Sequence, residues 1–519
     1  MWRGLILAVA AMTVANTVSL GDESAVVDLN YVARQALDRA RRPFRSPSLD
    51  LPSVLRTLNY DQYRQIRFRR GQALWTSGDL PFRVEFFHPG YLYQDPVHLY
   101  EFTSTHLQRI RFVRDFFDYG NLHVQNNLPT DMGYAGFRIL YQLNATNVWD
   151  ELGAFLGASY FRLLGRDQRY GQSARGLAIN CGEATVPEEF PLFTDWWLGK
   201  PAKGDTDLVL YALLDSVSCT GAYEFHIDPG NITAVDVSAI LYFRSRKVVL
   251  SADTNAPAVN TLGLAPLTSM FWFGKNSERK FDDYRPEVHD ADGLLMKLND
   301  GRTLWSPLDN PASLRNEVFP APNIKGFGLL QRERDFADYQ DSFNRYDLEP
   351  SVWIQPHGNW GPGAIHLVEL SSVWEGEDNV VAFWAPATNP VPLQPYRFGY
   401  TMFWEMGDAD TRLSPNRVVS TRIGVDPADS TCRIFMLDFK GQELGHIPLF
   451  DPPRAIVNCG TNATLVNTQV FPCPELGAWR VELKMRPQLP SPAPVHLDCT
   501  LEYGTNIVSE TWTYQWNQP

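Results

Sequence analysis

The stretch Tyr396-Arg397-Phe398-Gly399-Tyr400-Thr401-Met402-Phe403-Trp404-Glu405-Met406 places an apolar side chain at every second position. Side chains of a β-strand point alternately to the two faces of a sheet, so this period of two predicts a strand with one apolar face. The same period returns at 479–485 and at 512–516. We therefore expect residues 396–519 to form a small β-sandwich of immunoglobulin-like size.

A proline-rich stretch precedes this predicted sandwich. Residues 386–395 read Pro-Ala-Thr-Asn-Pro-Val-Pro-Leu-Gln-Pro, and prolines at this density make a chain stiff and extended. We interpret residues 389–395 as a linker between two domains. The larger domain, residues 22–388, contains short apolar and aromatic runs broken by Gly, Pro, Asn and Asp. This pattern predicts a second all-β sandwich, because the regular strand–helix alternation of βαβ units is not apparent.

The composition agrees with a globular β protein. The 519 residues are 44% hydrophobic and 20% charged, which is too apolar for a disordered chain. The 36 Gly and 37 Pro, together with 13% aromatic residues, are typical of turn-rich β structure. The formal net charge of −13 argues against nucleic acid as a partner, because phosphate binding needs a basic face.

The N-terminus predicts export. Arg3 is followed by an apolar run from Leu5 to Ala15 and by the small residues Ser19 and Gly21, a pattern typical of a secretory signal peptide over residues 1–21. The alternative is an N-terminal membrane anchor. The even number of cysteines fits an oxidising compartment and predicts one or two disulfides near the C-terminus. These cysteines are Cys181, Cys219, Cys432, Cys459, Cys473 and Cys499, and their spacing suggests no zinc site.

One helix is predicted just after the signal segment. Asp28 can cap its N-terminus, and apolar residues from Leu29 to Ala40 then recur at helical spacing. Pro43 follows and cannot continue the helix.

Carboxylates and indoles are dense between residues 270 and 385. Three polar stretches stand out, at 284–293, 331–341 and 374–379. Aromatic faces stack on sugar rings, and paired carboxyl groups perform acid–base catalysis on glycosidic bonds, so this composition favours a glycan site. The structural alternative is that the charges form solvated faces and the indoles belong to the core. Signatures of P-loop, zinc-protease and serine-hydrolase sites are absent.

Six strings of this sequence resemble a known family. They are Gly157-Ala158-Ser159-Tyr160-Phe161-Arg162, Tyr170-Gly171-Gln172-Ser173-Ala174-Arg175-Gly176-Leu177-Ala178, Ala265-Pro266-Leu267-Thr268-Ser269-Met270-Phe271, Tyr284-Arg285-Pro286-Glu287-Val288-His289-Asp290, Gly326-Phe327-Gly328-Leu329-Leu330-Gln331-Arg332 and Asp378-Asn379-Val380-Val381-Ala382-Phe383-Trp384. In this order they resemble the periplasmic glucan biosynthesis proteins G and D. The resemblance does not separate the two types.

The resemblance implies a fold, a location and an activity. It implies a large N-terminal galactose-mutarotase-like β-sandwich followed by a small immunoglobulin-like β-sandwich, in the periplasm. The implied process is the biosynthesis of osmoregulated periplasmic glucans. The implied substrate is their β-1,2-glucan backbone, cleaved by an inverting glycoside hydrolase or rearranged by a transglycosylase. It implies no cofactor, and as partners it suggests the membrane glucan glucosyltransferase and a second copy of the chain as a homodimer.

The resemblance also assigns site residues. It places the general acid at Asp378, a second acidic residue at Glu375 and the base-side aspartate at Asp290. Its roles fit the chemistry of inverting glycosidases, in which one carboxyl group protonates the leaving oxygen and one carboxylate activates water. We expect Asp290 to be ionised in its role, and its structural alternative is a turn aspartate that caps its own backbone. Trp353, Trp360 and Trp384 are either sugar platforms or core residues.

Two other functions stay open at this point. One is a non-catalytic glucan-binding module that assists the membrane glucosyltransferase, which would depend on tryptophans rather than on aspartates. The other is a mutarotase-like epimerase, which would need a paired His and Glu in a small pocket, and no motif of that kind is apparent.

Overall fold

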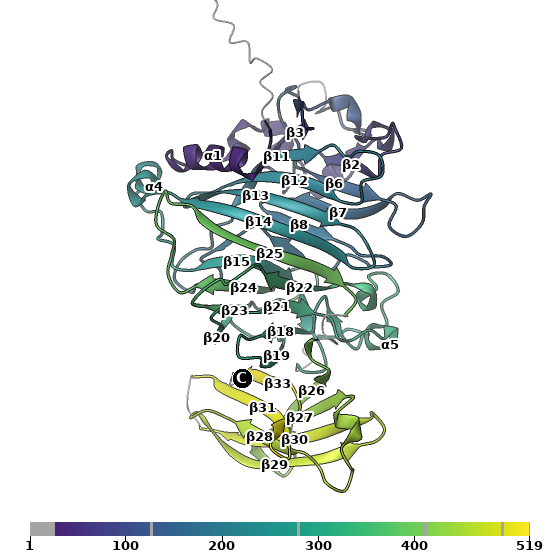
Figure 1. The fold of residues 1–519 in the computed structure, drawn as a ribbon, viewed down its shortest axis with the longest axis vertical. Coiled ribbons are helices and arrows are strands. Elements are labelled where there is room, and N and C mark those ends of the chain that lie inside the picture. The colour runs from purple at the N-terminus through teal and green to yellow at the C-terminus, as the bar shows by residue number, and fades with distance from the viewer. Residues whose placement is uncertain (1–25, 125–127, 278–280, 408–412, 489–492, 518–519) are drawn as a thin grey trace, which may run out of the picture.

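β-Strands dominate the structure, a computed structural model that describes residues 26–124, 128–277, 281–407, 413–488 and 493–517. The all-β class is confirmed. Figure 1 shows a large β domain with a smaller one, formed by the C-terminal part of the chain, packed against one end. The predicted signal peptide, residues 1–21, lies outside the described residues. Among the described helices, none is both long enough and apolar enough to cross a membrane.

The first sheet of the large domain has its strands in the order β2-β6-β7-β8-β9-β15-β24-β23-β20, with β10 added beside β15. All of its pairings are antiparallel. The strands are β2 (Phe82–Phe87), β6 (Gly136–Tyr141), β7 (Asp150–Leu156), β8 (Tyr160–Leu163), β9 (Ser173–Arg175), β10 (Ala178–Ile179), β15 (Leu262–Ser269), β20 (Arg315–Pro320), β23 (Gly363–Glu369) and β24 (Val380–Pro386).

The second sheet is longer and runs from the large domain into the small one. Its order is β28-β31-β33-β19-β18-β21-β22-β25-β14-β13-β12-β11-β3-β4, with β32 added beside β31. The strands are β3 (His98–Phe102), β4 (Leu107–Ile110), β11 (Leu192–Gly199), β12 (Leu208–Asp215), β13 (Cys219–Asp228), β14 (Thr233–Phe243), β18 (Gly293–Lys297), β19 (Thr303–Pro307), β21 (Gly326–Leu330), β22 (Ser351–Pro356), β25 (Tyr396–Glu405), β28 (Arg454–Asn458), β31 (Val495–Tyr503), β32 (Asn506–Ile507) and β33 (Thr511–Trp516).

Aromatic side chains fill the space between these two sheets. Phe137 on β6 meets Trp196 on β11 edge to face, with ring centroids 5.2 Å apart, and Phe155 on β7 meets Phe225 on β13 in the same way at 5.9 Å. All four rings are buried. Burying a large apolar side chain contributes about 1.5–3 kcal/mol, so this layer is a main source of stability.

The small domain is a sandwich of its own. One face is the sheet β26-β27-β30-β29, and the opposite face is formed by β28, β31 and β33. Phe435 on β27 contacts Trp512 and Tyr514 on β33 with ring centroids 5.8 and 5.9 Å apart. The four strands of the first face are β26 (Asn416–Asp426), β27 (Asp429–Gly441), β29 (Ala463–Cys473) and β30 (Ala478–Pro487).

The predicted domain boundary at residue 396 is wrong. The strand predicted from the alternating stretch exists as β25, but it pairs with β14 and β22 in the middle of the large domain's second sheet. Residues 389–395 therefore connect two strands of the large domain, β24 and β25, and do not link two domains. The period of two predicts a strand and its buried face, whereas it carries no information on the pairing partners.

The predicted N-terminal helix is confirmed. Helix α1 (Leu29–Ala40) begins after Asp28, whose side chain accepts a hydrogen bond from the Tyr31 amide at 2.6 Å. Its apolar face packs on β12, β13 and β14. The other helices are short: α2 (Ser53–Arg56), α3 (Tyr60–Tyr63), α4 (Arg246–Ala252), α5 (Phe336–Tyr339), and the 3₁₀ turns η1 (Pro47–Asp50), η2 (Arg70–Gln72), η3 (Arg114–Phe116), η5 (Tyr346–Leu348) and η6 (Leu444–His446).

Two small sheets complete the large domain. The first pairs β1 (Arg67–Phe68) with β5 (Phe117–Asp118), and the second pairs β16 (Phe271–Phe273) with β17 (Val288–His289). β17 of the second sheet is followed directly in the chain by Asp290, one of the predicted site residues.

The predicted disulfides are not formed. All six cysteines are free thiols, and those in the small domain have separate neighbours. Cys432 lies 3.3 Å from a carboxylate oxygen of Asp429, Cys459 lies 3.6 Å from the Ala463 carbonyl, and Cys473 lies 3.8 Å from Glu475. An even cysteine count predicts pairing only where the fold brings two sulfurs together.

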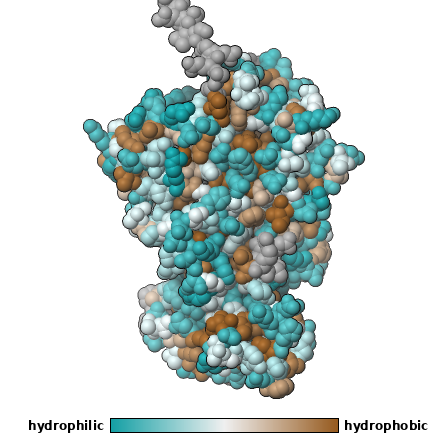
Figure 2. Space-filling model, viewed as in Figure 1, coloured by the Kyte–Doolittle hydropathy of each residue, from teal (hydrophilic) through white to brown (hydrophobic). Residues whose placement is uncertain are grey.

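A buried ion pair fixes the two domains to each other. Arg332, just after β21, donates from Nη1 and Nη2 to the two carboxylate oxygens of Glu510 at 2.7 and 3.0 Å. Its guanidinium also lies 3.5 Å from the ring centroid of Trp305. The same carboxylate accepts the Val418 amide of β26 at 2.7 Å, so one buried anion joins β21, β26 and β33. Figure 2 shows the narrowing of the molecule at this junction.

Glu510→Ala is expected to destabilise the protein by about 3–5 kcal/mol, because removal of one partner leaves the other charge of a buried pair uncompensated. Urea unfolding followed by tryptophan fluorescence measures this loss. Glu502→Ala is the matched control, since the Arg454–Glu502 pair lies at the surface of the same domain and is worth at most about 1 kcal/mol. Equal losses in both variants would contradict the role of the buried pair.

Candidate active site

Two loops that enter different sheets meet at one hydrogen-bonded segment. Asp290 lies between β17 and β18, which leads into the second sheet, and Asp378 lies just before β24 of the first sheet. The Asp290 amide donates to the Met270 carbonyl at 2.9 Å. The side chain of Asn379 accepts from the Phe271 amide at 2.9 Å and donates to the Phe271 carbonyl at 3.0 Å. Residues 270–271 thus hold both aspartates, which are 88 positions apart in the chain (378 minus 290).

Asp290 lies at the inner side of this site. It is 8% exposed. Burial is the main cause that raises the pKa of Asp290 to about 7, and repulsion from Asp378 adds to it, while Arg162 opposes the shift. The expectation that Asp290 is simply ionised is therefore modified: near pH 7 it is poised between its two forms, which is where a general base is most effective.

Asp378 lies at the outer side. Its side chain is 29% exposed, and its Oδ2 accepts a hydrogen bond from Arg162 Nη2 at 3.4 Å. Arg162 comes from β8 of the first sheet, and Ser173 on the neighbouring β9 orients it by accepting from Nε at 2.6 Å. A single guanidinium therefore faces both aspartates, and a ligand entering from solvent would meet Asp378 first.

Glu349 is a third acid in the site that sequence reasoning missed. It lies between η5 and β22, is buried, and its carboxyl group is hydrogen-bonded to that of Asp290. Burial, followed by the charge of Asp290, holds the pKa of Glu349 well above its usual range. No local pattern around Glu349-Pro350 could have revealed this contact, because it depends on how β18 and β22 are placed in the sheet.

Glu375 is held by two donors at the edge of the site. Its Oε2 accepts from Arg285 Nη1 at 2.5 Å and from the Tyr346 hydroxyl at 2.8 Å. Tyr346 in turn is close enough to Asp290 for the carboxylate to raise the pKa of the phenol, after burial and the hydrogen bond to Glu375. Glu375 therefore holds the Tyr346 hydroxyl, and Tyr346 lies beside Asp290.

Glu375→Gln is expected to reduce turnover about tenfold, because the loss of a charge-assisted hydrogen bond costs about 1.5–3 kcal/mol. The defect should appear in kcat, with KM nearly unchanged, if Glu375 acts through Tyr346. Tyr346→Phe should give a similar loss, and the double variant should be no worse than either single one. Additive losses would contradict a shared role.

The tryptophans named from the sequence belong to the core. Trp384 has no exposed surface and donates from Nε1 to the Ala321 carbonyl at 3.0 Å, and Trp353 is also buried. The predicted sugar-stacking role is wrong for these two residues, because a covered ring offers no face to a ligand. Trp360 is half-buried and packs edge to face on Trp384 at 5.3 Å and on Tyr400 at 6.2 Å, so its ring also serves the core.

Other aromatic rings lie exposed beside the site. Trp374 is 54% exposed and directly precedes Glu375, while Tyr284 is 77% exposed and directly precedes Arg285. Phe343 is 94% exposed, and its amide donates to Asp341, which is another partner of Arg285. The ion pairs that Arg285 makes with Asp341 and Glu375 thus tie three exposed rings to the edge of the site, where stacking on sugar rings is feasible.

An acidic cluster nearby is filled by a lysine. Glu287, Glu333 and Asp338 bring carboxylate oxygens close enough together to hold a metal ion. The Lys275 ammonium lies 2.9 Å from each of the three carboxylates, at the place that a cation would take. The three acids consequently do not fit a metal site.

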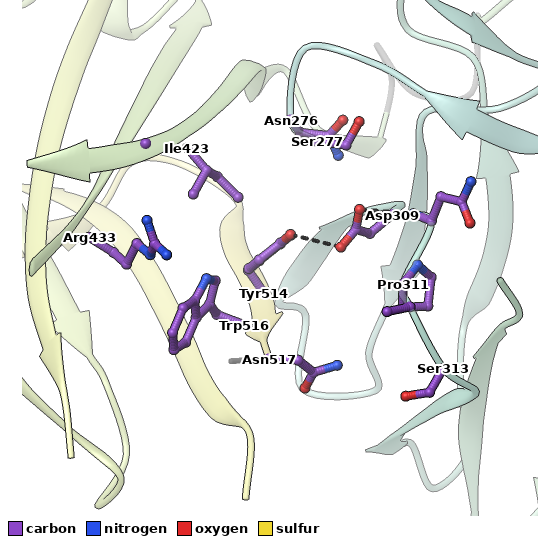
Figure 3. A pocket seen from close by; sticks show the side chains of 13 residues that line it. Asn276, Ser277, Asp309, Pro311, Ser313, Ile423, Arg433, Tyr514, Trp516 and Asn517 are labelled. Atoms are coloured by element: carbon purple, nitrogen blue, oxygen red, sulfur yellow. Dashed lines mark hydrogen bonds between the residues drawn. The ribbon is translucent and has the colours of Figure 1, made fainter. Parts of the chain in front are cut away.

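A pocket of 160 Å³ lies between the two domains, with Asp309 on one side and Arg433 and Trp516 on the other (Figure 3). The Tyr514 hydroxyl donates to Asp309 across it at 3.3 Å. Among its described lining residues Asp309 is the only acid, so this pocket cannot place two carboxyl groups around one sugar–sugar bond. The cluster around Asp290 and Asp378 remains the candidate active site.

Comparison with known proteins agrees with the sequence resemblance. A family model described as "Periplasmic glucan biosynthesis protein, MdoG" matches residues 27–516. The chain is 41% identical over 495 residues to a "Glucans biosynthesis protein G" of Ralstonia nicotianae, covering 94% of this chain and 95% of that protein.

Two further relatives carry the same description. The protein of Serratia proteamaculans is 38% identical over 498 residues, and that of Pseudomonas paraeruginosa is 39% identical over 497 residues. Each alignment covers 94% of this chain and 92% of the relative.

Proposed function

Because this chain belongs to the family of periplasmic glucan biosynthesis proteins (MdoG), we propose that it cleaves, or cleaves and rejoins, the β-1,2-glucan backbone of periplasmic glucans. Its involvement in glucan biosynthesis follows from the family. The reaction, the linkage and the residue roles are the proposal, and they rest on the candidate active site.

One observation carries this proposal: two acidic side chains that are remote in the sequence converge on one site from the two sheets. Asp378 is accessible and Asp290 lies deeper, and Arg162 faces both of them. Paired carboxyl groups of this kind, one on each side of a scissile bond, are the catalytic apparatus of most glycosidases.

The proposed reaction divides the proton transfers between the two aspartates. Asp378 donates its proton to the glycosidic oxygen while the bond from that oxygen to C1 breaks. A water molecule attacks C1 from the opposite face, and its proton passes to Asp290, directly or through a water or a sugar hydroxyl. The anomeric centre is inverted, and no cofactor is needed, because only protons and one water are exchanged.

The reaction needs a protonated Asp378 and an ionised Asp290. Asp378 is accessible in the free protein, and a bound sugar would remove water from around it, which favours the neutral acid. Asp290 must lose its proton before it can act as the base. Since the pKa of Asp290 is raised to about 7, the rate should fall on the acid side of neutrality.

In this proposal, the exposed aromatic rings bind the glucan. Successive glucosyl units can stack on the exposed rings of Trp374, Tyr284 and Phe343. Aromatic contacts typically contribute about 0.5–1.5 kcal/mol each. The sequence of residues 1–21 fits an exported protein, which agrees with a periplasmic place of action.

Incubation of the purified protein with linear β-1,2-glucan tests the proposal, with reducing ends measured over time. New reducing ends or rearranged chains support it. Affinity for the polymer without any change in chain length, lost on Trp374→Ala and kept in Asp378→Asn, would instead support the alternative of a non-catalytic glucan-binding module.

A further inference from the structure

We propose that Glu349 is a positioning residue that stays neutral and donates the hydrogen bond that holds the Asp290 carboxylate in place. The proposal rests on the proposed function of Asp290 as the base, and it adds a third acid to the site. The carboxyl pair itself can be tested without any substrate.

The chain encloses the carboxyl group of Glu349, a residue that is only 2% exposed. A Cβ atom at position 171 would lie 2.2 Å from Glu349 Oε2. The backbone of Gly171, just before β9, therefore packs directly against the carboxyl group. Gln172 donates from Nε2 to the Pro350 carbonyl at 2.8 Å and to the Leu329 carbonyl at 3.1 Å. These hydrogen bonds hold the backbone next to Glu349, and with it the segment that carries this side chain.

Too few positive charges surround Asp290 and Glu349 to stabilise both carboxyl groups as anions. The groups that face Glu349 are Asp290, Arg162, Arg334 and the Tyr346 phenol, and those that face Asp290 are Glu349, Asp378, Arg162, His289 and the same phenol. Arg162 already binds Asp378, and the Arg334 guanidinium donates to Ser351 Oγ and to backbone carbonyls. Two buried carboxyl groups in contact cannot both ionise at neutral pH, so they share one proton.

Two observations place that proton on Glu349. Its Oε2 is buried and has no hydrogen-bond partner among the described residues, a condition that costs much less for a neutral acid than for a carboxylate. Burial, followed by the charge of Asp290, holds the pKa of Glu349 well above its usual range, which agrees with a neutral acid at this position. Glu349 is accordingly the donor and Asp290 the acceptor.

The hydrogen bond from Glu349 orients the Asp290 carboxylate and keeps the pKa of Asp290 low enough for it to act as a base. Without it, a carboxylate buried beside Asp378 would hold its own proton more tightly and lose its function as a base at neutral pH. A neutral acid supplies the hydrogen bond without adding a further negative charge to the site.

Glu349→Ala and Glu349→Gln separate this role from a merely structural one. In Glu349→Ala the acid limb of the kcat/KM profile should move up by about one pH unit, because a hydrogen bond to a charged group is lost. Glu349→Gln keeps a neutral donor and should restore the position of that limb and most of the activity. Glu317→Gln is the matched control, because Glu317 is a buried glutamate on β20, at the edge of the first sheet, whose carboxylate faces His496; it should leave the limb in place.

A spectroscopic measurement decides the protonation state independently of turnover. The infrared difference spectrum of wild type minus Glu349→Gln at pH 7 should show the carbonyl stretch of a protonated carboxylic acid. Carboxylate bands in that difference would overturn the proposal, as would an unshifted acid limb in Glu349→Ala. The carbonyl band in a wild-type protein that does not process glucan would support the carboxyl pair and contradict only the proposed function.

Discussion

Asp378→Asn is expected to lower kcat on linear β-1,2-glucan by about 10³-fold, within the range that a general acid contributes. Asparagine keeps the size of the side chain and can still contact the glycosidic oxygen, but it has no proton to transfer. Affinity for the polymer should change little, since the exposed rings remain. The measurement is the rate of reducing-end formation together with binding of the polymer to the inactive variant.

Glu377→Gln is the matched control for this experiment. Glu377 lies one position before Asp378 in the same exposed loop, and its carboxylate accepts from Ser372 rather than facing Asp290. The control should keep nearly full activity. An Asp378→Asn variant that processes glucan as fast as the control would remove Asp378 from the mechanism.

Asp290→Asn is expected to abolish turnover and to stabilise the folded protein at alkaline pH relative to wild type. The folded state holds the Asp290 proton up to about pH 7, whereas the unfolded chain releases it near the ordinary aspartate pKa of 3.8. Between these values the unfolded state binds fewer protons, so wild-type stability falls as pH rises. The contribution amounts to about 1.4 kcal/mol for each unit of pKa difference, so the effect is on the order of 4 kcal/mol.

Urea unfolding of wild type and Asp290→Asn at pH 4 and pH 8 measures this effect. The difference in the free energy of unfolding should be small at pH 4, grow between pH 4 and 7, and stay constant above pH 7. Glu377→Gln, which removes an exposed carboxylate, should show no such growth. A constant difference between wild type and Asp290→Asn at all pH values would contradict a raised pKa at Asp290.

Local sequence patterns predicted individual helices and strands better than they predicted which strands pair with each other. The cap at Asp28 and the spacing of its apolar residues predict α1 with its observed bounds, because a helix is decided by contacts within about four residues. The alternation at 396–406 predicts β25, but its neighbours β14 and β22 come from distant parts of the chain. Strand pairing depends on those long-range contacts, which is why the domain boundary was misplaced.

The candidate active site shows the same difference between what local sequence patterns reveal and what depends on long-range contacts. Asp378 and Asp290 come from the family resemblance, since the strings around them are distinctive. Glu349 and Arg162 enter the site through sheet geometry and carry no local signal of a role there. Indoles in a sequence give no sign of their exposure, and so Trp384 in β24 and Trp374 in the preceding loop, which differ completely in burial, could not be ranked without the structure.

The anomeric form of the first product tests the central claim most directly, namely that Asp378 and Asp290 act on opposite faces of one glycosidic bond. Proton NMR recorded during the first minutes of β-1,2-glucan cleavage distinguishes the two anomers before they interconvert. Inversion predicts that the new reducing ends appear as the α anomer and only later equilibrate. New ends that appear first as the β anomer would contradict the paired roles of the two aspartates.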